Sequence, residues 1–183
     1  MPAGFLLAPL LIISAKPTIL SLIVGAAISI CGLMIRAWAS GFLRKNQELT
    51  TTGPYAHTRN PLYLGTFILG TGIAISGGAP WFVALFMALY LLIYVPVMFA
   101  EAETLRQLFS KEYEHYSERV PLFLPRLTAY RAPSDHSADA MEEARGERQF
   151  DTSRYLKHRE YRAAMGLVIV YALLAAKFLF INH

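Results

Sequence analysis

The sequence predicts an all-α integral membrane protein, a polytopic helical bundle with four to five transmembrane helices in a single membrane-embedded domain over residues 1–183. Of the 183 residues, 55% are hydrophobic and only 16% are charged, and the mean hydropathy is +0.37. An ordinary soluble domain of this length carries more charge. Apolar stretches long enough for membrane helices also alternate with short polar segments.

The charge pattern argues against nucleic acid as a partner. The formal net charge is +4, but the basic residues are not gathered in a patch without acids. The single cysteine, Cys31, excludes a disulfide within the chain, and its apolar surroundings predict a buried, inert thiol. No Lys or Arg precedes Lys16, so the N-terminal stretch lacks the charged region of a secretory signal peptide and is expected to be retained.

The first apolar stretches predict one uncertain and one clear membrane helix. Residues 3–15 are short for a crossing, and we expect a short or partly re-entrant helix there. Residues 19–39 are long enough for one crossing. Within them Gly25, Ser29 and Gly32 form a stripe of small residues, which favours close contact with another helix.

A helical hairpin is predicted next, with helices over residues 62–76 and 81–100 and a turn at 77–80. The turn carries no charge, whereas the loops 40–61 and 101–162 hold three and eleven of the seventeen Lys and Arg residues. Because positive loops stay on the cytoplasmic side, both long loops are predicted to be cytoplasmic.

The predicted helix after the turn contains Pro96, which should kink it. Residues 101–120 should continue as an amphipathic helix along the interface, until Val120-Pro121 ends it. Its apolar side is expected to hold Leu105, Leu108 and Phe109, and its two tyrosines, Tyr113 and Tyr116, are expected to serve packing.

The last third of the chain begins with a polar cytoplasmic loop over residues 126–153, to which we assign no chemistry. A helix over 154–181 follows and should cross the membrane from Ala163 onward. Lys177 near its end can reach the far interface with its long side chain.

Most of the recognisable chemistry lies where the polar loop enters the helix at Pro61. Gly53-Pro54 indicates a turn, Asn60 is a preferred N-cap residue, and Pro61 suits the first helical turn. A helix N-terminus attracts anions, and Arg59 stands beside it. Alternatively, the segment is an interfacial loop, with Tyr55 and Tyr63 as anchors at headgroup level and Arg59 as a positive-inside residue.

Two sequence blocks in order resemble the isoprenylcysteine carboxyl methyltransferase family. The first runs Gly53-Pro54-Tyr55 and then Arg59-Asn60-Pro61-Leu62-Tyr63-Leu64-Gly65, similar to the family's G-P/V-Y and R-H/N-P-x-Y-x-G. The second block is similar to the family's E-E-x-x-L-x-x-x-F-G-x-x-Y-x-x-Y-x-x-x-V-P and contains Glu101, Leu105, Phe109, Tyr113, Tyr116 and Val120-Pro121. The resemblance covers roughly residues 30–125 and extends more loosely to the phospholipid methyltransferases.

The resemblance implies a membrane enzyme that uses S-adenosyl-L-methionine without a Rossmann-type sheet. Carried over by position, Glu101 and Arg59 are the expected catalytic residues. The Glu101 carboxylate can attract the cofactor's positively charged sulfonium and amino group. The Arg59 guanidinium can attract the cofactor's own carboxylate. The expected cofactor-binding residues are Gln47, Glu48, Leu49, Thr50, Tyr55, Asn60, Pro61, Leu62, Tyr63 and Glu101. His57 lies outside the family pattern and is expected to be a solvated loop residue.

Three positions depart from the family pattern. Ala102 replaces the second Glu, and Glu103 cannot substitute because it lies 200° from Glu101 around a helix with about 100° per residue. Val97 replaces the arginine that carboxyl methyltransferases place toward the substrate, which makes a prenylcysteine carboxylate a doubtful acceptor. Ser110 stands where the family commonly has Gly, a change expected to disturb little.

The leading functional hypothesis is methyl transfer to a lipophilic or isoprenoid-like small molecule, similar to protein-S-isoprenylcysteine O-methyltransferase. The first alternative is a phospholipid N-methyltransferase. Alternatives of another class are an NADPH-dependent sterol-reductase-like membrane enzyme or a non-enzymatic membrane assembly protein. The expected partners are the lipid bilayer and a lipophilic substrate, with no metal and no nucleic acid. The expected location is a multi-pass membrane position, the inner membrane if the source is bacterial, with the site facing the cytoplasm.

Overall fold

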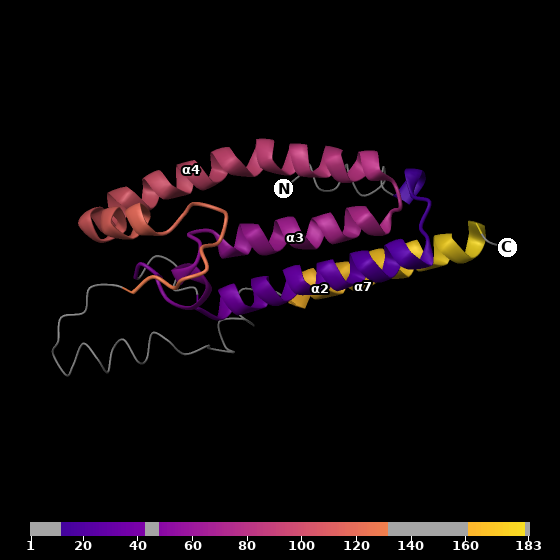
Figure 1. Ribbon diagram of the computed structural model, residues 1–183, viewed down its shortest axis with the longest axis horizontal. Coiled ribbons are helices and arrows are strands. Elements are labelled where there is room, and N and C mark those ends of the chain that lie inside the picture. Colours follow the sequence, from indigo (N-terminus) through magenta and orange to yellow (C-terminus); the bar gives the residue numbers. More distant parts are fainter. Residues whose placement is uncertain (1–11, 43–47, 132–160, 182–183) are drawn as a thin grey trace. The chain divides into compact units, whose positions relative to one another are not determined.

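The computed structural model describes residues 12–42, 48–131 and 161–181, and these residues are helical or irregular, with no strand among them. The elements, in chain order, are α2 (Ile19–Phe42), the 3₁₀ helix η1 (Gly53–Ala56), α3 (Pro61–Ser76), α4 (Pro80–Arg119) and α7 (Tyr161–Ile181) (Figure 1). The all-α prediction is confirmed. The chain forms two compact units, residues 1–34, 65–93 and 161–183 in the first and residues 35–64 and 94–160 in the second.

Among the described helices, α2, α4 and α7 are long and apolar enough to cross a membrane. The fourth, α3, has 16 residues and is a shorter apolar helix. At about 1.5 Å per residue it measures ~24 Å, less than the ~30 Å of a bilayer core. The protein is thus a helical membrane bundle with three candidate spans and one shorter apolar helix. Most of the predicted first stretch, 3–15, lies outside the described residues, as do the polar loop from residue 132 and the start of the predicted last helix, 154–160.

The first unit is held together by very close contact between α2 and α3. A Cβ atom added to Gly32 would lie 2.3 Å from the backbone nitrogen of Leu69, and one added to Gly25 would lie 2.4 Å from the carbonyl oxygen of Gly72. Only glycine leaves room for backbones this near to each other. The predicted small-residue stripe of α2 is therefore confirmed as a helix contact. The facing side of α3 also contains small residues, among them Gly72.

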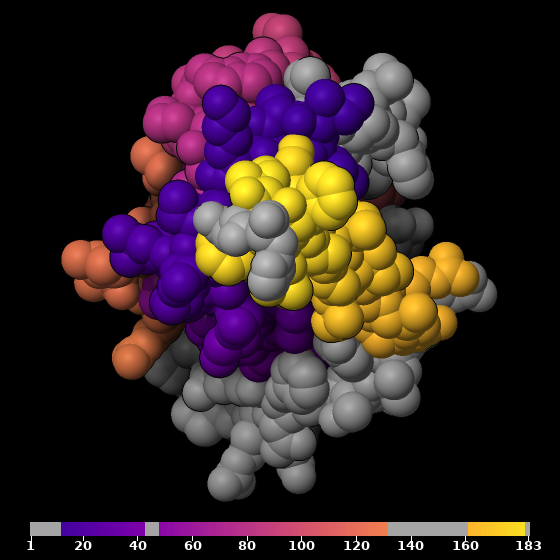
Figure 2. All heavy atoms as spheres, turned by 90° about the vertical axis from the view of Figure 1, so that its right-hand side faces the viewer, coloured from indigo at the N-terminus to yellow at the C-terminus, as the bar shows by residue number. Residues whose placement is uncertain are grey.

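Helix α7 joins this pair through hydroxyl groups. The Tyr171 hydroxyl lies 3.1 Å from Oγ of Ser29 and 2.7 Å from Oγ of Ser76, and both serines are fully buried. Lys177 was predicted to reach the far interface. Its ammonium donates hydrogen bonds to the carbonyl oxygens of Ile12 and Ile13, the second at 2.8 Å, and its reach to a membrane interface stays a prediction. Figure 2 shows the end of α7, in yellow, packed against the indigo N-terminal region.

Cys31 is exposed on the surface of α2, so the prediction of a buried thiol is wrong. In a soluble domain, an apolar run indicates burial within the protein. In a membrane helix, the same run can face lipid, and only 17% of the most apolar window of α2 is buried inside the structure.

In the second unit, α4 presents one regularly spaced face to the interior. Met98, Tyr113, Tyr116 and Val120 are buried, and Ala102, Leu105 and Phe109 are half-buried between them. Leu108, predicted to share this side, is 59% exposed. The steps of three and four residues are those of an amphipathic helix.

The backbone of α4 breaks at Ser110, and the kink predicted at Pro96 stays a prediction. Ser110 has φ 38° and ψ −111°, while Pro96 lies within the helix. A positive φ is disfavoured for residues with a side chain and is tolerated best by glycine. Serine at this position therefore carries a conformational cost that the sequence comparison did not reveal.

Candidate functional site

The loop before α3, residues 53–60, is called here the signature loop. It opens with Gly53 at φ 59°, where an added Cβ would lie 2.7 Å from the Phe42 ring. The 3₁₀ turn η1 follows, and α3 begins at Pro61 as predicted. Both a positive φ and the nearby ring require glycine at the first position. Pro61 is fully buried as the first residue of its helix.

Residues 120–130, called here the clasp segment, hold the signature loop by hydrogen bonds. The Thr58 hydroxyl donates to the carbonyl oxygen of Phe123 at 2.9 Å, and the Asn60 side-chain amide donates to that of Leu122 at 2.9 Å. The Arg59 backbone N–H donates to the carbonyl oxygen of Pro121 at 3.0 Å. Three successive loop residues are thus tied to three successive residues of the clasp segment.

Further along the chain, the clasp segment also bonds to earlier residues of the signature loop. The backbone N–H of Arg126 donates to the His57 carbonyl oxygen, and that of Tyr130 donates to the Ala56 carbonyl oxygen, both at 2.9 Å. Nδ1 of His57 lies 2.9 Å from the Arg126 carbonyl oxygen, which can only accept, so Nδ1 carries a proton. His57 is half-buried and bonded rather than a free loop residue.

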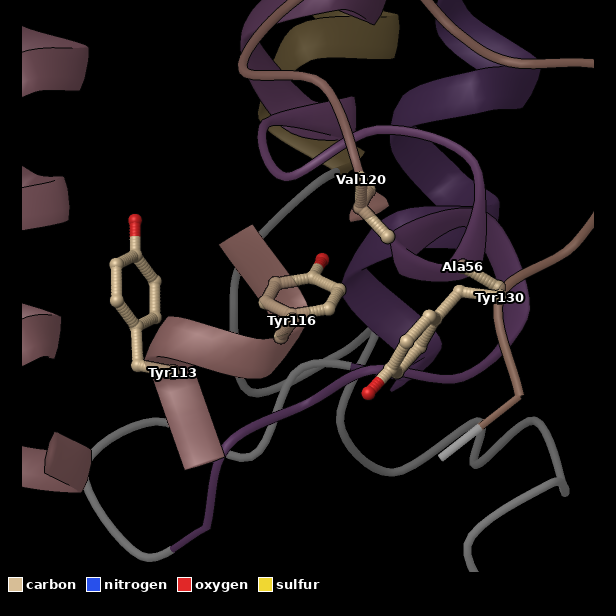
Figure 3. Close-up of a cluster of buried hydrophobic side chains, with 5 residues drawn as sticks. All are labelled: Ala56, Tyr113, Tyr116, Val120 and Tyr130. Atoms are coloured by element: carbon tan, nitrogen blue, oxygen red, sulfur yellow. The ribbon is translucent and has the colours of Figure 1, made fainter. Parts of the chain in front are cut away.

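A buried tyrosine cluster lies beneath this contact (Figure 3). The Tyr116 ring packs at 6.2 Å from the Tyr113 ring and 5.5 Å from the Tyr130 ring, with Ala56 and Val120 completing the group. The Tyr116 hydroxyl donates to the carbonyl oxygen of Tyr55 at 2.6 Å. Burial raises the pKa of the Tyr116 hydroxyl well above its usual range, and nearby Tyr55 adds to this effect while the Arg59 charge opposes it. The prediction that Tyr113 and Tyr116 serve packing is confirmed.

Arg59 leaves the signature loop and rests against Tyr113. Its Nη1 donates to the Tyr113 hydroxyl at 2.9 Å, and its guanidinium carbon lies 5.8 Å from the centre of the same ring. Within the described part of the chain, Nε of Arg59 is buried and has no hydrogen-bond partner. A buried donor without a partner is costly, so this side of the guanidinium is suited to an acceptor other than the described residues.

The other expected catalytic residue, Glu101, meets the first turn of α3. The Tyr63 hydroxyl donates a hydrogen bond to the Glu101 carboxylate, and the Tyr63 ring lies 5.5 Å from that of Tyr94. Glu103 is exposed and forms an ion pair at 2.9 Å with Arg106. The predicted difference between the two glutamates is confirmed, since among the described residues Glu101 contacts Tyr63 of the first sequence block and Glu103 pairs with Arg106.

The remaining predicted residues fall into four groups. Tyr55 is buried with Ala39 and Phe42, and Leu62 packs against them. Leu49 packs against the tyrosine cluster, Thr50 is half-buried and Glu48 is exposed. Gln47 lies outside the described residues. Asn60 donates its side-chain amide to the clasp segment, so this contact is structural.

Sequence reasoning missed the clasp segment. It placed residues 126–130 in a polar loop without chemistry, although Arg126 and Tyr130 pair with the signature loop through backbone groups. Backbone pairing leaves no side-chain pattern in the sequence. The only available signal was the apolar run after Val120, with Tyr130 at its end. Among the described residues, no group of three or more His, Cys, Asp or Glu side chains could hold a metal ion.

Comparison with known proteins gives a family and two relatives. Residues 10–112 match the model of the phospholipid methyltransferase family. A nickel-cobalt-cadmium resistance protein of Alcaligenes xylosoxydans xylosoxydans is 33% identical over 55% of this chain and 48% of its own length. A cobalt-zinc-cadmium resistance protein of Cupriavidus metallidurans is 34% identical over 65% of this chain and 55% of its own length.

This chain spans about half the length of the curated relatives that it matches. No solved structure matches it. The family match covers more than half of the 183 residues and includes the signature loop, Tyr63 and Glu101. The chain belongs to the phospholipid methyltransferase family.

Proposed function

We propose that the protein is an integral membrane methyltransferase that uses S-adenosylmethionine to methylate a lipophilic substrate. Membership of the phospholipid methyltransferase family supports the reaction class. The helices long enough to cross a membrane support a substrate that reaches the site from lipid. The observation that carries the proposal is the pairing of Tyr63 with Glu101, because it brings the two sequence blocks together at one place.

The polar groups of the second unit fit the cofactor's charges. S-adenosylmethionine carries a carboxylate and two positive groups, an ammonium and a sulfonium. Glu101 is exposed and offers a carboxylate that accepts a hydrogen bond from Tyr63. Arg59 offers a positive charge and a buried Nε that lacks a partner among the described residues. One negative and one positive group therefore stand available for ligand charges of the opposite sign.

In this proposal the protein contributes mainly orientation and exclusion of water. When bound, S-adenosylmethionine supplies an electrophilic methyl group. Tyr63 orients the Glu101 carboxylate by donating to it, and Tyr113 holds the Arg59 guanidinium from one side. Such positioning supports methyl transfer because well-oriented reactants gain up to ~7–11 kcal/mol over free ones.

Val97 supports a proposal for the chemical class of the methyl acceptor. This residue precedes Glu101 by one helical turn, and its side chain is 42% exposed and uncharged. A carboxylate substrate would lack the cationic partner that an arginine gives at this position. An amine or hydroxyl on a lipophilic molecule is therefore the proposed acceptor. We expect methyl transfer to an amine-bearing phospholipid and poor transfer to a prenylcysteine analogue; efficient ester formation on the latter would refute this choice.

Cofactor binding is the decisive test of the reaction class. Detergent-solubilised protein is titrated in a calorimeter with S-adenosylhomocysteine and, separately, with NADPH. We expect heat of binding only with S-adenosylhomocysteine. Binding of NADPH alone would support the sterol-reductase-like alternative, and binding of neither would favour a non-enzymatic assembly role.

The same titration tests Glu101. Glu101→Gln preserves shape and removes the charge, and it should weaken S-adenosylmethionine binding by roughly 1.5–3 kcal/mol, about 10- to 150-fold. Glu103→Gln is the matched control, because Glu103 is solvated and paired only with Arg106. Equal cofactor affinity in Glu101→Gln and the unchanged protein would remove Glu101 from the site.

The relatives' names record resistance to metal ions. We propose no metal chemistry for this chain on that ground. The proposed location is a bacterial-type inner membrane with the signature loop on the cytoplasmic side, which the positive charges of residues 40–61 and 101–131 support.

A further inference from the structure

The clasp segment carries an exposed apolar surface that the proposed reaction does not use. Leu127 is 98% exposed and Leu124 is 72% exposed. Leucines exposed singly are ordinary on protein surfaces. These two occur three residues apart on an irregular segment whose backbone is fixed by hydrogen bonds, so their exposure is a stable feature of the segment.

Arg126 holds the segment in the shape that presents the leucines outward. Its Nη1 donates to the carbonyl oxygen of Arg119 at 2.6 Å, and its Nη2 and Nε donate to the Thr128 hydroxyl at 2.7 and 3.2 Å. The guanidinium thus closes residues 119–128 into a loop. The donors of Arg126 are thus bonded within the segment, while Leu124 and Leu127, which flank it in the chain, are exposed.

The charge of this stretch is complementary to an anionic lipid surface. Residues 119–131 contain three arginines, Arg119, Arg126 and Arg131, and no acidic residue. Loops that combine exposed leucines with arginines bind the interfacial region of bilayers, where apolar side chains enter the acyl boundary and cations meet headgroups.

The hydrogen bonds also place the clasp segment at the edge of an apolar region. Asn60, which is bonded to Leu122, immediately precedes α3, and the 16 residues of α3 contain no charged side chain. The clasp segment is therefore bonded to the last residue of the polar loop that leads into an apolar helix. For a membrane protein this is the level of the headgroups.

We propose that Leu124 and Leu127 insert into the bilayer interface and fix the signature loop at the membrane surface. The lipid contact is coupled to the loop because the residues next to these leucines, Phe123 and Arg126, bond to Thr58 and His57. This inference goes beyond the proposed function, since it holds whether or not the protein transfers methyl groups.

Depth-dependent fluorescence quenching tests the proposal on the full chain. Trp38 and Trp81 are replaced by Phe, and Leu127→Trp provides the only indole. The protein is placed in nanodiscs of phosphatidylcholine and phosphatidylglycerol, with or without bromine on the acyl carbons near the headgroup. We expect blue-shifted emission from Leu127→Trp and loss of most of its fluorescence in the brominated nanodiscs.

Glu118→Trp in the same background is the matched control, because Glu118 is exposed on the last turns of α4. Its emission should stay at the solvent-exposed wavelength and should not be quenched. Leu124→Trp repeats the measurement if Leu127→Trp does not fold. Unquenched, solvent-like emission at position 127, or equal quenching at 118 and 127, would overturn the proposal. Blue-shifted but unquenched emission would also overturn it, because that result indicates a protein partner.

Discussion

Tyr116→Phe tests whether the tyrosine cluster supports the signature loop. The substitution removes the hydroxyl that donates to the Tyr55 carbonyl oxygen at 2.6 Å, from a side chain that is only 2% exposed. The ring packing is preserved, so the loss is that of one hydrogen bond plus a buried carbonyl left without its partner. Such losses cost about 1–3 kcal/mol, and we expect the free energy of unfolding to fall by that amount.

The pH dependence of the same pair gives a second signature. Burial raises the pKa of Tyr116 in the folded protein, whereas the unfolded chain has an ordinary tyrosine pKa near ~10. The unfolded state therefore loses this proton first as pH rises. The stability linked to Tyr116 is fully present below about pH 10 and declines above it, by up to ~1.4 kcal/mol per pH unit. Tyr116→Phe should flatten this alkaline decline.

The assay is denaturant or thermal unfolding in detergent between neutral and alkaline pH. Tyr130→Phe is the matched control, because it alters the same cluster but removes a hydroxyl that makes no hydrogen bond among the described residues. It should change stability by no more than about 0.5 kcal/mol. If Tyr116→Phe is as stable as Tyr130→Phe and keeps the alkaline decline, the Tyr116 hydroxyl does not hold the loop.

Three further predictions follow from the backbone and the topology. Gly72→Ala should lower the melting temperature measurably, because a Cβ there would lie 2.4 Å from Ser29 Oγ and 2.5 Å from the Gly25 carbonyl oxygen. Gly166→Ala, with nothing within 4 Å, should not lower it, and equal effects would contradict the close α2–α3 contact. Ser110→Gly should stabilise the protein by about 1 kcal/mol by relieving its positive φ, which thermal unfolding would detect; a loss of stability would show that the serine is not strained. Glu118→Cys, in a Cys31→Ser background, should react with an impermeant maleimide only after cells are opened, and labelling of intact cells would reverse the proposed orientation.

The helices and their membrane character could be predicted from the sequence because they depend on local composition. The start of α3 at Pro61 follows from the loop residues before it and from proline's fixed φ. The stripe of Gly25, Ser29 and Gly32 predicted a close helix contact, since small residues favour it wherever the partner lies. The separation of Glu101 from Glu103 followed from helical geometry alone.

Other features depended on which surfaces meet. Cys31 and Leu108 are exposed although their neighbours are apolar. Their exposure could not be predicted, because an apolar run does not say whether lipid or protein covers each side of a helix. The backbone of α4 breaks at Ser110, and the family's usual glycine at this position was the one sequence signal for it, although the change to serine was expected to disturb little.

The candidate site likewise has features that the sequence predicted and features that only the fold revealed. Glu101 and Tyr63 could be named from their motifs, but only folding brought the hydroxyl to the carboxylate, since the two lie 38 residues apart in the chain. The clasp segment could not be foreseen, because it holds the signature loop through backbone groups that every residue carries. The sequence by itself determined the membrane helices and the residues that bear charge, and the tertiary structure decided which of those residues share a contact. The reason is that helix formation follows local spacing, whereas hydrogen bonds between distant segments depend on how the packed helices position their loops.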